Sequence, residues 1–144
     1  MNTHPSISVV VPTYNAPGLL ERTLQSLATQ NYEGDVQVVV VDDGSTVFEP
    51  NGWKQLCHPL PLEVVRLPTN QGRACARNAG IRKAQGELIL FLDGDMTVAP
   101  GFLSAHAEAA KQHAGSVGIG NIQFSSDVQM DAMTRYMEKR GVAR

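Results

Sequence analysis

The sequence predicts an α/β fold with three layers, in which helices cover both faces of a mostly parallel central sheet. Short runs rich in valine and isoleucine alternate with segments of helical periodicity, which is the order of elements that a parallel sheet requires. Most of these runs are apolar at successive positions instead of alternating with polar residues. The strands are therefore expected to be buried on both faces of the sheet.

The first two strands have the clearest pattern. Residues 7–11 read ISVVV and residues 36–41 read VQVVVV. Between them, Asn15 and Pro17 are the residue types that favour a helix cap and a first helical turn. The helix that follows is expected to bury a stripe of leucines at helical spacing, namely Leu20, Leu24 and Leu27.

The later elements follow from the same reasoning. Residues 48–61 contain three prolines and the tryptophan, and are expected to be irregular. Further elements are expected at residues 62–67 (strand), 71–84 (helix), 87–92 (strand), 100–113 (helix), 117–124 (strand) and 127–140 (helix). The last helix carries an apolar stripe of Met130, Met133 and Met137. Such a stripe faces a core, or a second copy of the chain in a homo-oligomer.

Composition narrows the class of protein. A length of 144 residues, with 42% hydrophobic and 18% charged residues, is typical of one globular domain. The net charge of −2 argues against a nucleic-acid partner. No apolar run approaches the ~20 residues that span a bilayer, and the N-terminus lacks the pattern of a secretory signal. Cys57 and Cys75 fit neither a disulfide framework nor a CxxC pair, so a cytoplasmic protein is expected.

Polar turns follow three of the predicted strands. Residues 12–15 read PTYN, residues 42–45 read DDGS and residues 93–95 read DGD. Because the carboxyl ends of parallel strands meet at one edge of a sheet, where α/β proteins bind ligands, the three turns are expected to form one site. Any one of these turns is also ordinary loop chemistry, and it is the shared edge that favours a site.

The DGD turn predicts a divalent cation. Asp93 and Asp95 are close enough to repel each other unless a positive charge lies between them. Mg²⁺ and Mn²⁺ take one or two protein carboxylates and complete their shells with water and substrate phosphates. A metal shared with a phosphorylated ligand is therefore expected. Arg73 and Arg77, one helical turn apart, either bind an anion such as a diphosphate or form a solvated basic face.

Four longer segments contain these turns: SVVVPTYNAPGLLERTLQSLATQ, VVVVDDGST, NQGRACARNAGIRKAQGELILFLDGDM and VAPGFL. In this order and spacing, from residue 8 to about residue 102, they resemble the family 2 glycosyltransferases, which have the Rossmann-like GT-A fold. The resemblance implies a single GT-A type nucleotide-sugar-binding domain over residues 1–144. It implies a metal-assisted, inverting transfer of sugar from a nucleoside-diphosphate donor, with a UDP-sugar as the first choice and Mn²⁺ or Mg²⁺ as cofactor.

The resemblance also implies which residues contact the nucleotide. Pro12 and Tyr14 would line the nucleobase pocket, Pro12 through its backbone and Tyr14 through its ring. Asp43 would hydrogen-bond the base, with Asp42 supporting the turn or the ribose. Arg77 would face the nucleotide. The partners implied are this donor and a carbohydrate or lipid-linked acceptor, reached at the cytoplasmic face of a membrane by peripheral association.

On the metal side, the resemblance places Asp93 near the ribose and the metal's water shell, and makes Asp95 the direct metal ligand. The base that deprotonates the acceptor lies well beyond this motif in inverting members, and no residue up to Arg144 matches it. Asp127 and Asp131 follow no motif of the family. The acceptor-binding half is thus expected to be absent from these residues or supplied by a partner, with little or no turnover by the chain alone.

Alternatives to this function stay open. One alternative is a non-catalytic module, in which a shortened domain would bind a nucleoside diphosphate and a metal but transfer no sugar. Residues 93–97, DGDMT, also fit the DxDxT signature of haloacid-dehalogenase-type phosphatases, in which the motif follows the first strand instead of the fourth. A dinucleotide-binding domain would need GxGxxG after the first strand, where this chain has PTYN.

Overall fold

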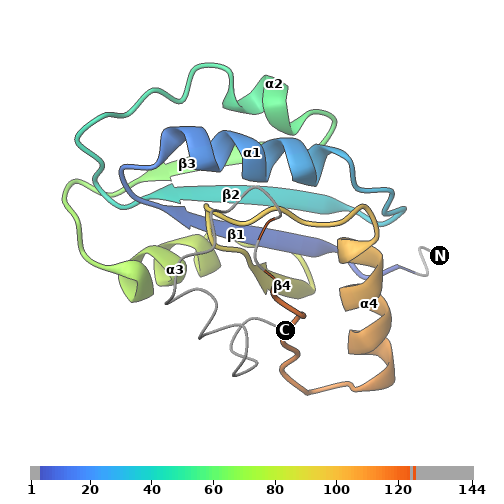
Figure 1. The fold of residues 1–144 in the computed structure, drawn as a ribbon. Helices are drawn as coiled ribbons and strands as arrows, with labels where there is room; N and C mark the ends of the chain where they lie inside the picture. The colour runs from blue at the N-terminus through green and yellow to red at the C-terminus, as the bar shows by residue number, and fades with distance from the viewer. Residues whose placement is uncertain (1–3, 124, 126–144) are drawn as a thin grey trace, which may run out of the picture.

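The computed structural model describes residues 4–123 and 125. Strands and helices alternate along this part of the chain, as the sequence predicts (Figure 1). The strands are β1 (Ile7–Thr13), β2 (Val36–Asp42), β3 (Leu62–Arg66) and β4 (Leu88–Phe91). The helices are α1 (Pro17–Ala28), α2 (Trp53–Cys57), α3 (Arg73–Ile81) and α4 (Phe102–Gln112).

The strands form one parallel sheet with the order β3-β2-β1-β4. The register of β1 and β2 runs from Ile7 opposite Val36 to Thr13 opposite Asp42, so the two strands end side by side. The chain adds β2 and then β3 on one side of β1, and returns to place β4 on its other side. The strand order therefore reverses beside β1, which is the position where open α/β sheets bind ligands.

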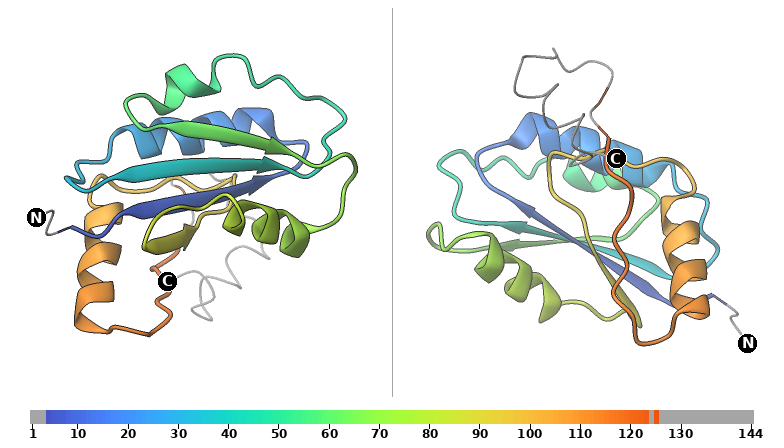
Figure 2. Two further views of the ribbon diagram at one scale, coloured as in Figure 1. Left: turned by 180° about the vertical axis from the view of Figure 1, so that it is seen from behind. Right: turned by 60° about the horizontal axis from the view of Figure 1, so that its bottom comes forward.

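Two apolar cores lie on the two faces of the sheet. Successive residues of a strand point to opposite faces, so Val9 and Val11 belong to one core and Val10 to the other. The first core is completed by α1, α2 and α4, through Leu20, Leu24, Leu27, Trp53, Cys57, Leu103 and Ala107. The second is completed by α3, through Ala76 and Ala79. Figure 2 shows α1 and α2 over one face and α3 over the other, which confirms the three-layer α/β/α prediction.

Two predictions about the first half of the chain need correction. Asn15 does not cap α1. The N-cap is Ala16, with Pro17 at the first helical position, and the Asn15 side chain instead accepts a hydrogen bond from the backbone of Thr46. The segment expected to be irregular contains the short helix α2, because it buries Trp53, which is only 3% exposed, against the first core.

Two later predictions differ as well. Helix α3 is shorter than the predicted residues 71–84 at both ends, because Gly72 before it has a φ of +91°, outside the helical region, and residues 82–83 form a turn. The strand predicted at 117–124 is wrong for residues 117–123, which form no strand, and Val117 is 95% exposed. Two glycines interrupt this run, and glycine weakens a strand.

Some sequence predictions lie outside the described residues. These are the helix at 127–140 and its methionine stripe of Met130, Met133 and Met137, together with Asp127 and Asp131. Within the described residues, no helix has both the length and the apolar character that crossing a bilayer requires.

Candidate functional site

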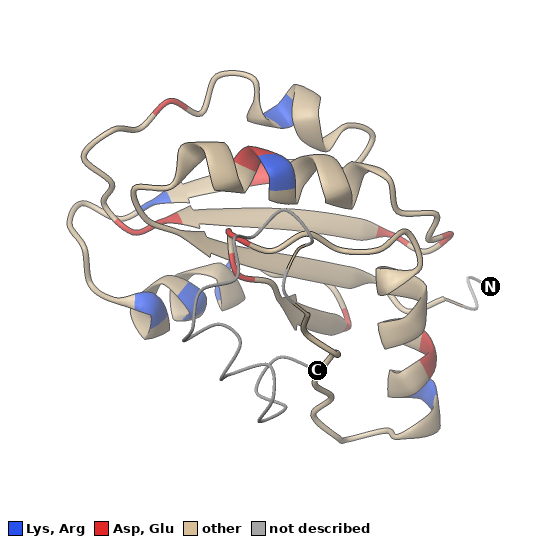
Figure 3. Cartoon of the chain, viewed as in Figure 1, with Lys and Arg blue, Asp and Glu red and all other residues tan. Residues whose placement is uncertain are grey.

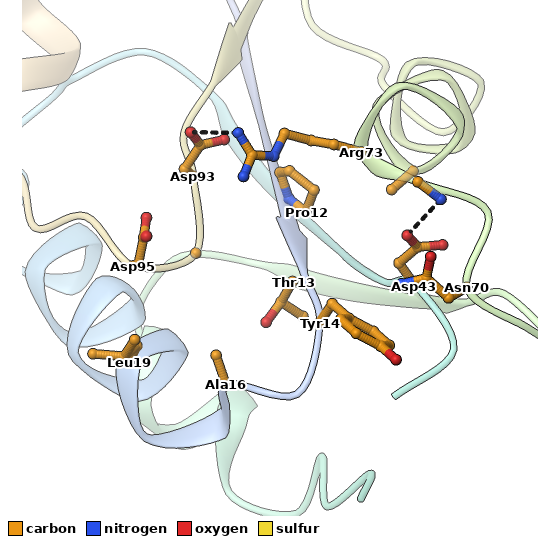
Figure 4. A pocket seen from close by; sticks show the side chains of 13 residues that line it. Pro12, Thr13, Tyr14, Ala16, Leu19, Asp43, Asn70, Arg73, Asp93 and Asp95 are labelled. Atoms are coloured by element: carbon orange, nitrogen blue, oxygen red, sulfur yellow. Dashed lines mark hydrogen bonds and ion pairs between the residues drawn. The ribbon is translucent and has the colours of Figure 1, made fainter. Parts of the chain in front are cut away.

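A cleft of about 370 Å³ opens at the carboxyl edge of the sheet, beyond the ends of β1 and β4. All three predicted polar turns contribute to it, together with the first residues of α1 and α3 (Figure 4). Its lining is Pro12, Thr13, Tyr14, Ala16, Leu19, Asp43, Asn70, Gly72, Arg73, Ala76, Asp93, Gly94 and Asp95. The site therefore lies where the strand order reverses.

One wall of the cleft combines an aromatic ring with a buried carboxylate. Tyr14 follows β1 and is 46% exposed, whereas Asp43 follows β2 and is 4% exposed. An exposed tyrosine ring is a surface on which another planar ring stacks, and a carboxylate accepts hydrogen bonds from ring N–H groups. This wall is chemically suited to a heterocyclic base.

The Asp43 carboxylate also holds the loop that leads into α3. Its Oδ1 accepts the backbone N–H of Gln71 over 2.8 Å, and its Oδ2 accepts that of Gly72 over 2.9 Å. Each oxygen keeps a further lone pair for a ligand. Gly44 fits this arrangement because its φ is +69°, and a Cβ there would lie 2.4 Å from the carbonyl carbon of Thr69. The DDGS turn and the loop before α3 are thus packed backbone against backbone.

Asp42 lies outside the lining of the cleft. It is 1% exposed, and its carboxylate accepts hydrogen bonds from the backbone and the hydroxyl of Ser45. The Nε of Arg66 lies 3.5 Å from Oδ2 of Asp42 and supplies the opposite charge. Of the two roles expected for Asp42, the structure favours support of the turn.

Basic residues of α3 face the DGD turn. Figure 3 shows the arginines of α3 and acidic residues in the loop after β4. Arg77 Nη2 donates to Asp93 Oδ1 over 2.8 Å, and Arg73 Nη1 lies 4.0 Å from Asp93 Oδ2. Arg73 lines the cleft with a side chain that is 71% exposed. Arg77 does not line it, and it pairs with Asp93 from behind the cleft.

Asp95 is the free carboxylate of the DGD turn. It is exposed in the cleft and has no hydrogen-bond or ion-pair partner among the described residues. Gly94 lets the turn approach β1 closely, because a Cβ there would lie 2.9 Å from the carbonyl oxygen of Pro12. Asp93 and Asp95 are therefore both brought to the cleft, one paired and the other unpaired.

These carboxylates fit a hard divalent cation held jointly with a ligand. Nowhere in residues 4–123 and 125 do three or more His, Cys, Asp or Glu side chains gather as a metal site. Mg²⁺ and Mn²⁺ need no such cage when phosphate oxygens and water complete their shells. An unpaired carboxylate beside Asp93, facing an open cleft, meets that requirement.

The structure brings most of the predicted site residues to one cleft. Pro12, Tyr14, Asp43, Asp93 and Asp95 line it, whereas Asp42 and Arg77 stand behind it. The lining residues that sequence reasoning did not single out include Asn70 and Leu19. Asn70 opens the NQGR run just before α3, and that position was the one signal that could have identified it. The DGD turn follows β4, the fourth strand in the sequence, unlike the phosphatase signature.

Comparisons with known sequences agree with the motifs. The model of the family described as "Glycosyl transferase family 2" matches residues 8–140. An N-acetylglucosaminyltransferase of Sinorhizobium fredii is 34% identical over 139 residues, which cover 93% of this chain and 33% of the relative. An uncharacterized glycosyltransferase of Haemophilus influenzae is 38% identical over 96 residues, covering 66% of this chain and 38% of the relative. The chain thus spans about a third of the length of each of these two relatives.

Solved structures of glycosyltransferases have the same fold. S. aureus TarS 1–349 in complex with UDP-GlcNAc has a TM-score of 0.68 and 30% identity, covering 83% of this chain and 38% of that one. The mannosyltransferase PcManGT from Pyrobaculum calidifontis, in complex with GDP-Man and Mn²⁺, has a TM-score of 0.67 and 33% identity. It covers 85% of this chain and 35% of that one. These neighbours are glycosyltransferases with the GT-A fold, as the motifs predict.

Proposed function

Since this chain belongs to glycosyl transferase family 2, we propose that its cleft binds the nucleoside diphosphate of a sugar donor. The whole protein then transfers the sugar to an acceptor hydroxyl. The observation that carries the proposal is that one cleft contains the exposed ring of Tyr14, the buried carboxylate of Asp43 and the unpaired carboxylate of Asp95. These groups suit a base at one end of the cleft and a diphosphate with its metal at the other.

The base end is formed by Pro12, Tyr14 and Asp43. The ring of Tyr14 stacks on the base, and the lone pairs that Asp43 does not use for the loop accept its N–H. Several relatives are named N-acetylglucosaminyltransferase, and TarS is in complex with UDP-GlcNAc. The mannosyltransferase PcManGT, whose TM-score is nearly the same as that of TarS, is in complex with GDP-Man. A UDP-sugar is the donor we propose, and UDP-GlcNAc is the first to test.

The diphosphate end is formed by Arg73 and the DGD turn. Arg73 provides an exposed positive charge at the first turn of α3, where the helix dipole also favours an anion. Asp95 is the proposed metal ligand, with Asp93 beside it and oriented by Arg77. A bound Mn²⁺ or Mg²⁺ supplies Lewis-acid stabilisation of the diphosphate as it leaves the sugar. The chain's own part is to hold these carboxylates and Arg73 around one space.

The acceptor side of the reaction is proposed to lie elsewhere in the whole protein. None of the described cleft residues is assigned as the base for the acceptor hydroxyl. A carbohydrate or lipid-linked acceptor, an inverting reaction and association with the cytoplasmic face of a membrane stay predictions of the family resemblance. For the 144 residues alone the proposal is donor binding, and transfer is a proposal for the whole protein.

Calorimetric titration of UDP into the chain, with and without Mn²⁺, tests this function. The matched variants are Asp95→Ala in the cleft and Glu21→Ala, an exposed carboxylate on α1 outside the cleft lining. We expect Mn²⁺-dependent binding by the wild type and by Glu21→Ala, and its loss in Asp95→Ala. Equal binding by Asp95→Ala would refute the metal ligand. A folded wild type that binds none of UDP, GDP and dTDP would refute the donor site.

A further inference from the structure

A row of side chains in contact runs behind the cleft, from the end of β3 to the turn that carries Tyr14. It begins at Arg66, whose Nε lies 3.5 Å from Asp42 Oδ2. These two residues are partners in the register of β2 and β3, so their side chains leave the sheet on the same face. Nη2 of Arg66 also donates to the carbonyl oxygen of Ser45 over 3.1 Å.

Ser45 connects this ion pair to the turn after β1. Its backbone N–H donates to Asp42 Oδ2 over 3.2 Å, and its hydroxyl donates to Asp42 Oδ1. The same hydroxyl accepts the backbone N–H of Asn15 over 2.9 Å. A hydroxyl has one proton to donate, so these two contacts assign the direction of each hydrogen bond. The ion pair therefore determines how Ser45 is presented to Asn15.

Asn15 is the far end of the row and stands between two residues that line the cleft. Its φ is +50°, a left-handed conformation that is uncommon for residues other than glycine and that asparagine tolerates better than most. Its Oδ1 accepts the backbone N–H and the hydroxyl of Thr46, over 2.9 and 3.1 Å. Its sequence neighbours Tyr14 and Ala16 both line the cleft.

Arg66 is itself held from its other side. Its guanidinium lies 4.4 Å from the centre of the Phe48 ring, in a cation–π contact. Phe48 packs edge-to-face on Trp53, with 5.8 Å between ring centres, and Trp53 is 3% exposed. The Asp42 side chain is 2% exposed, and a carboxylate buried to that degree requires a paired charge. Arg66 supplies this charge from a position anchored to the first core.

We propose that Arg66 is a positioning residue for the base end of the cleft. Through Asp42 and Ser45 it holds Asn15 in its left-handed conformation, and so sets where the ring of Tyr14 stands. The consequence for a nucleotide ligand is selective contact with its nucleobase, and this consequence rests on the function proposed above. Arg66, Asp42, Ser45 and Asn15 are absent from the cleft lining, so Arg66 acts on the ligand through Tyr14.

Amide hydrogen exchange of the free protein tests the positioning without any ligand. Arg66→Gln removes the charge and the planar donors, Arg66→Lys keeps the charge alone, and Arg82→Gln changes an exposed arginine just after α3 as the control. We expect the Asn15 and Thr46 amides to exchange about tenfold faster in Arg66→Gln, with Arg66→Lys between it and the wild type. The control should keep wild-type rates, as should Ala107 of α4 in every variant.

Unchanged exchange at Asn15 in Arg66→Gln would overturn the positioning role, whatever the protein binds. An equal rise at Ala107 would also overturn it, because it would mean a general loss of stability. If Arg66→Gln does not fold, the same comparison is made with Arg66→Lys, where faster exchange confined to Asn15 and Thr46 supports the role and wild-type rates overturn it.

Binding of UDP and of inorganic pyrophosphate, each with Mn²⁺, tests the selectivity. We expect the Kd of UDP to rise about tenfold in Arg66→Gln, because a displaced ring contacts the base poorly, while the Kd of pyrophosphate stays the same. Arg66→Lys should recover part of the UDP affinity. Equal weakening of both ligands would overturn the selectivity. A wild type that binds no nucleotide would overturn it together with the proposed donor site, whereas the exchange rates decide the positioning role separately.

Discussion

Arg77 Nη2 donates to Asp93 Oδ1 across 2.8 Å, so one carboxylate of the DGD turn is paired within the protein while Asp95 remains unpaired among the described residues. Only Gly94 separates the two acids in sequence, but they differ in whether their carboxylate oxygens are already engaged within the protein. Asp93 is bound to α3 and orients the turn. Asp95 offers its oxygens to the cleft without first breaking an ion pair.

This difference predicts unequal effects on stability. Asp93→Asn removes the negative charge from its pair with Arg77, whose side chains are about one-third exposed, and should lower the free energy of unfolding by about 1 kcal/mol. Asp95→Asn removes no internal contact and should change it by less than about 0.5 kcal/mol. Urea unfolding of both variants measures this, and equal losses would contradict the assignment of distinct roles.

Gly44 and Gly52 both have positive φ, and comparing their alanine variants distinguishes the cost of backbone strain from the cost of a steric clash. Gly44→Ala should cost about 2–4 kcal/mol, because φ is +69° and the new Cβ would lie 2.4 Å from the carbonyl carbon of Thr69. Gly52→Ala is the control, since φ is +96° there but no atom lies within 4 Å of a Cβ. It should cost only the backbone strain, about 1 kcal/mol. Thermal unfolding compares the two, and similar losses would show that the contact with Thr69 is unimportant.

The stability of the chain should fall in mild acid through His106. Burial lowers the pKa of His106, whose ring packs on Phe102 with 4.6 Å between centres. The unfolded state then binds the proton more tightly than the folded state, so stability is lost as the pH falls below about 6.5. His106→Gln should reduce the slope of unfolding free energy against pH between about pH 7 and 5. An unchanged slope in His106→Gln would contradict this role of His106.

The two thiols should differ in reactivity. Burial raises the pKa of Cys57 to about 11, and its side chain is inaccessible in the first core. Cys75 is exposed on α3. At about pH 8, a thiol reagent should modify Cys75 rapidly in the native protein and Cys57 only on unfolding. Cys75→Ser should abolish the rapid phase, and a rapid phase that survives in this variant would show that Cys57 is reachable.

Local pattern determined the architecture. The β-branched runs at 7–11 and 36–41 became β1 and β2, and the leucine stripe of α1 faces the first core, because burial on both sides leaves a signature at each residue. Parallel pairing then required the polar turns to meet at one edge. Pro12, Tyr14, Asp43, Asp93 and Asp95 could therefore be placed at one cleft from sequence.

Tertiary contacts decided what each polar side chain does. Asp42 and Asp43 are adjacent and chemically identical, yet neighbouring residues at a strand end point to opposite sides. Both carboxylates are buried, but register with Arg66 pairs Asp42 with a positive charge behind the cleft, whereas the loop before α3 holds Asp43 at the cleft.

The same holds for Asn15, whose type predicts a cap. Its side chain instead accepts hydrogen bonds from Thr46, which lies on another turn. Burial and periodicity leave a pattern along the chain, so sequence alone determined the four strands β1 to β4, the presence of α1, α3 and α4, and the edge that carries the site. The partner of a polar group is set by residues distant in sequence, and only the folded structure brings them together.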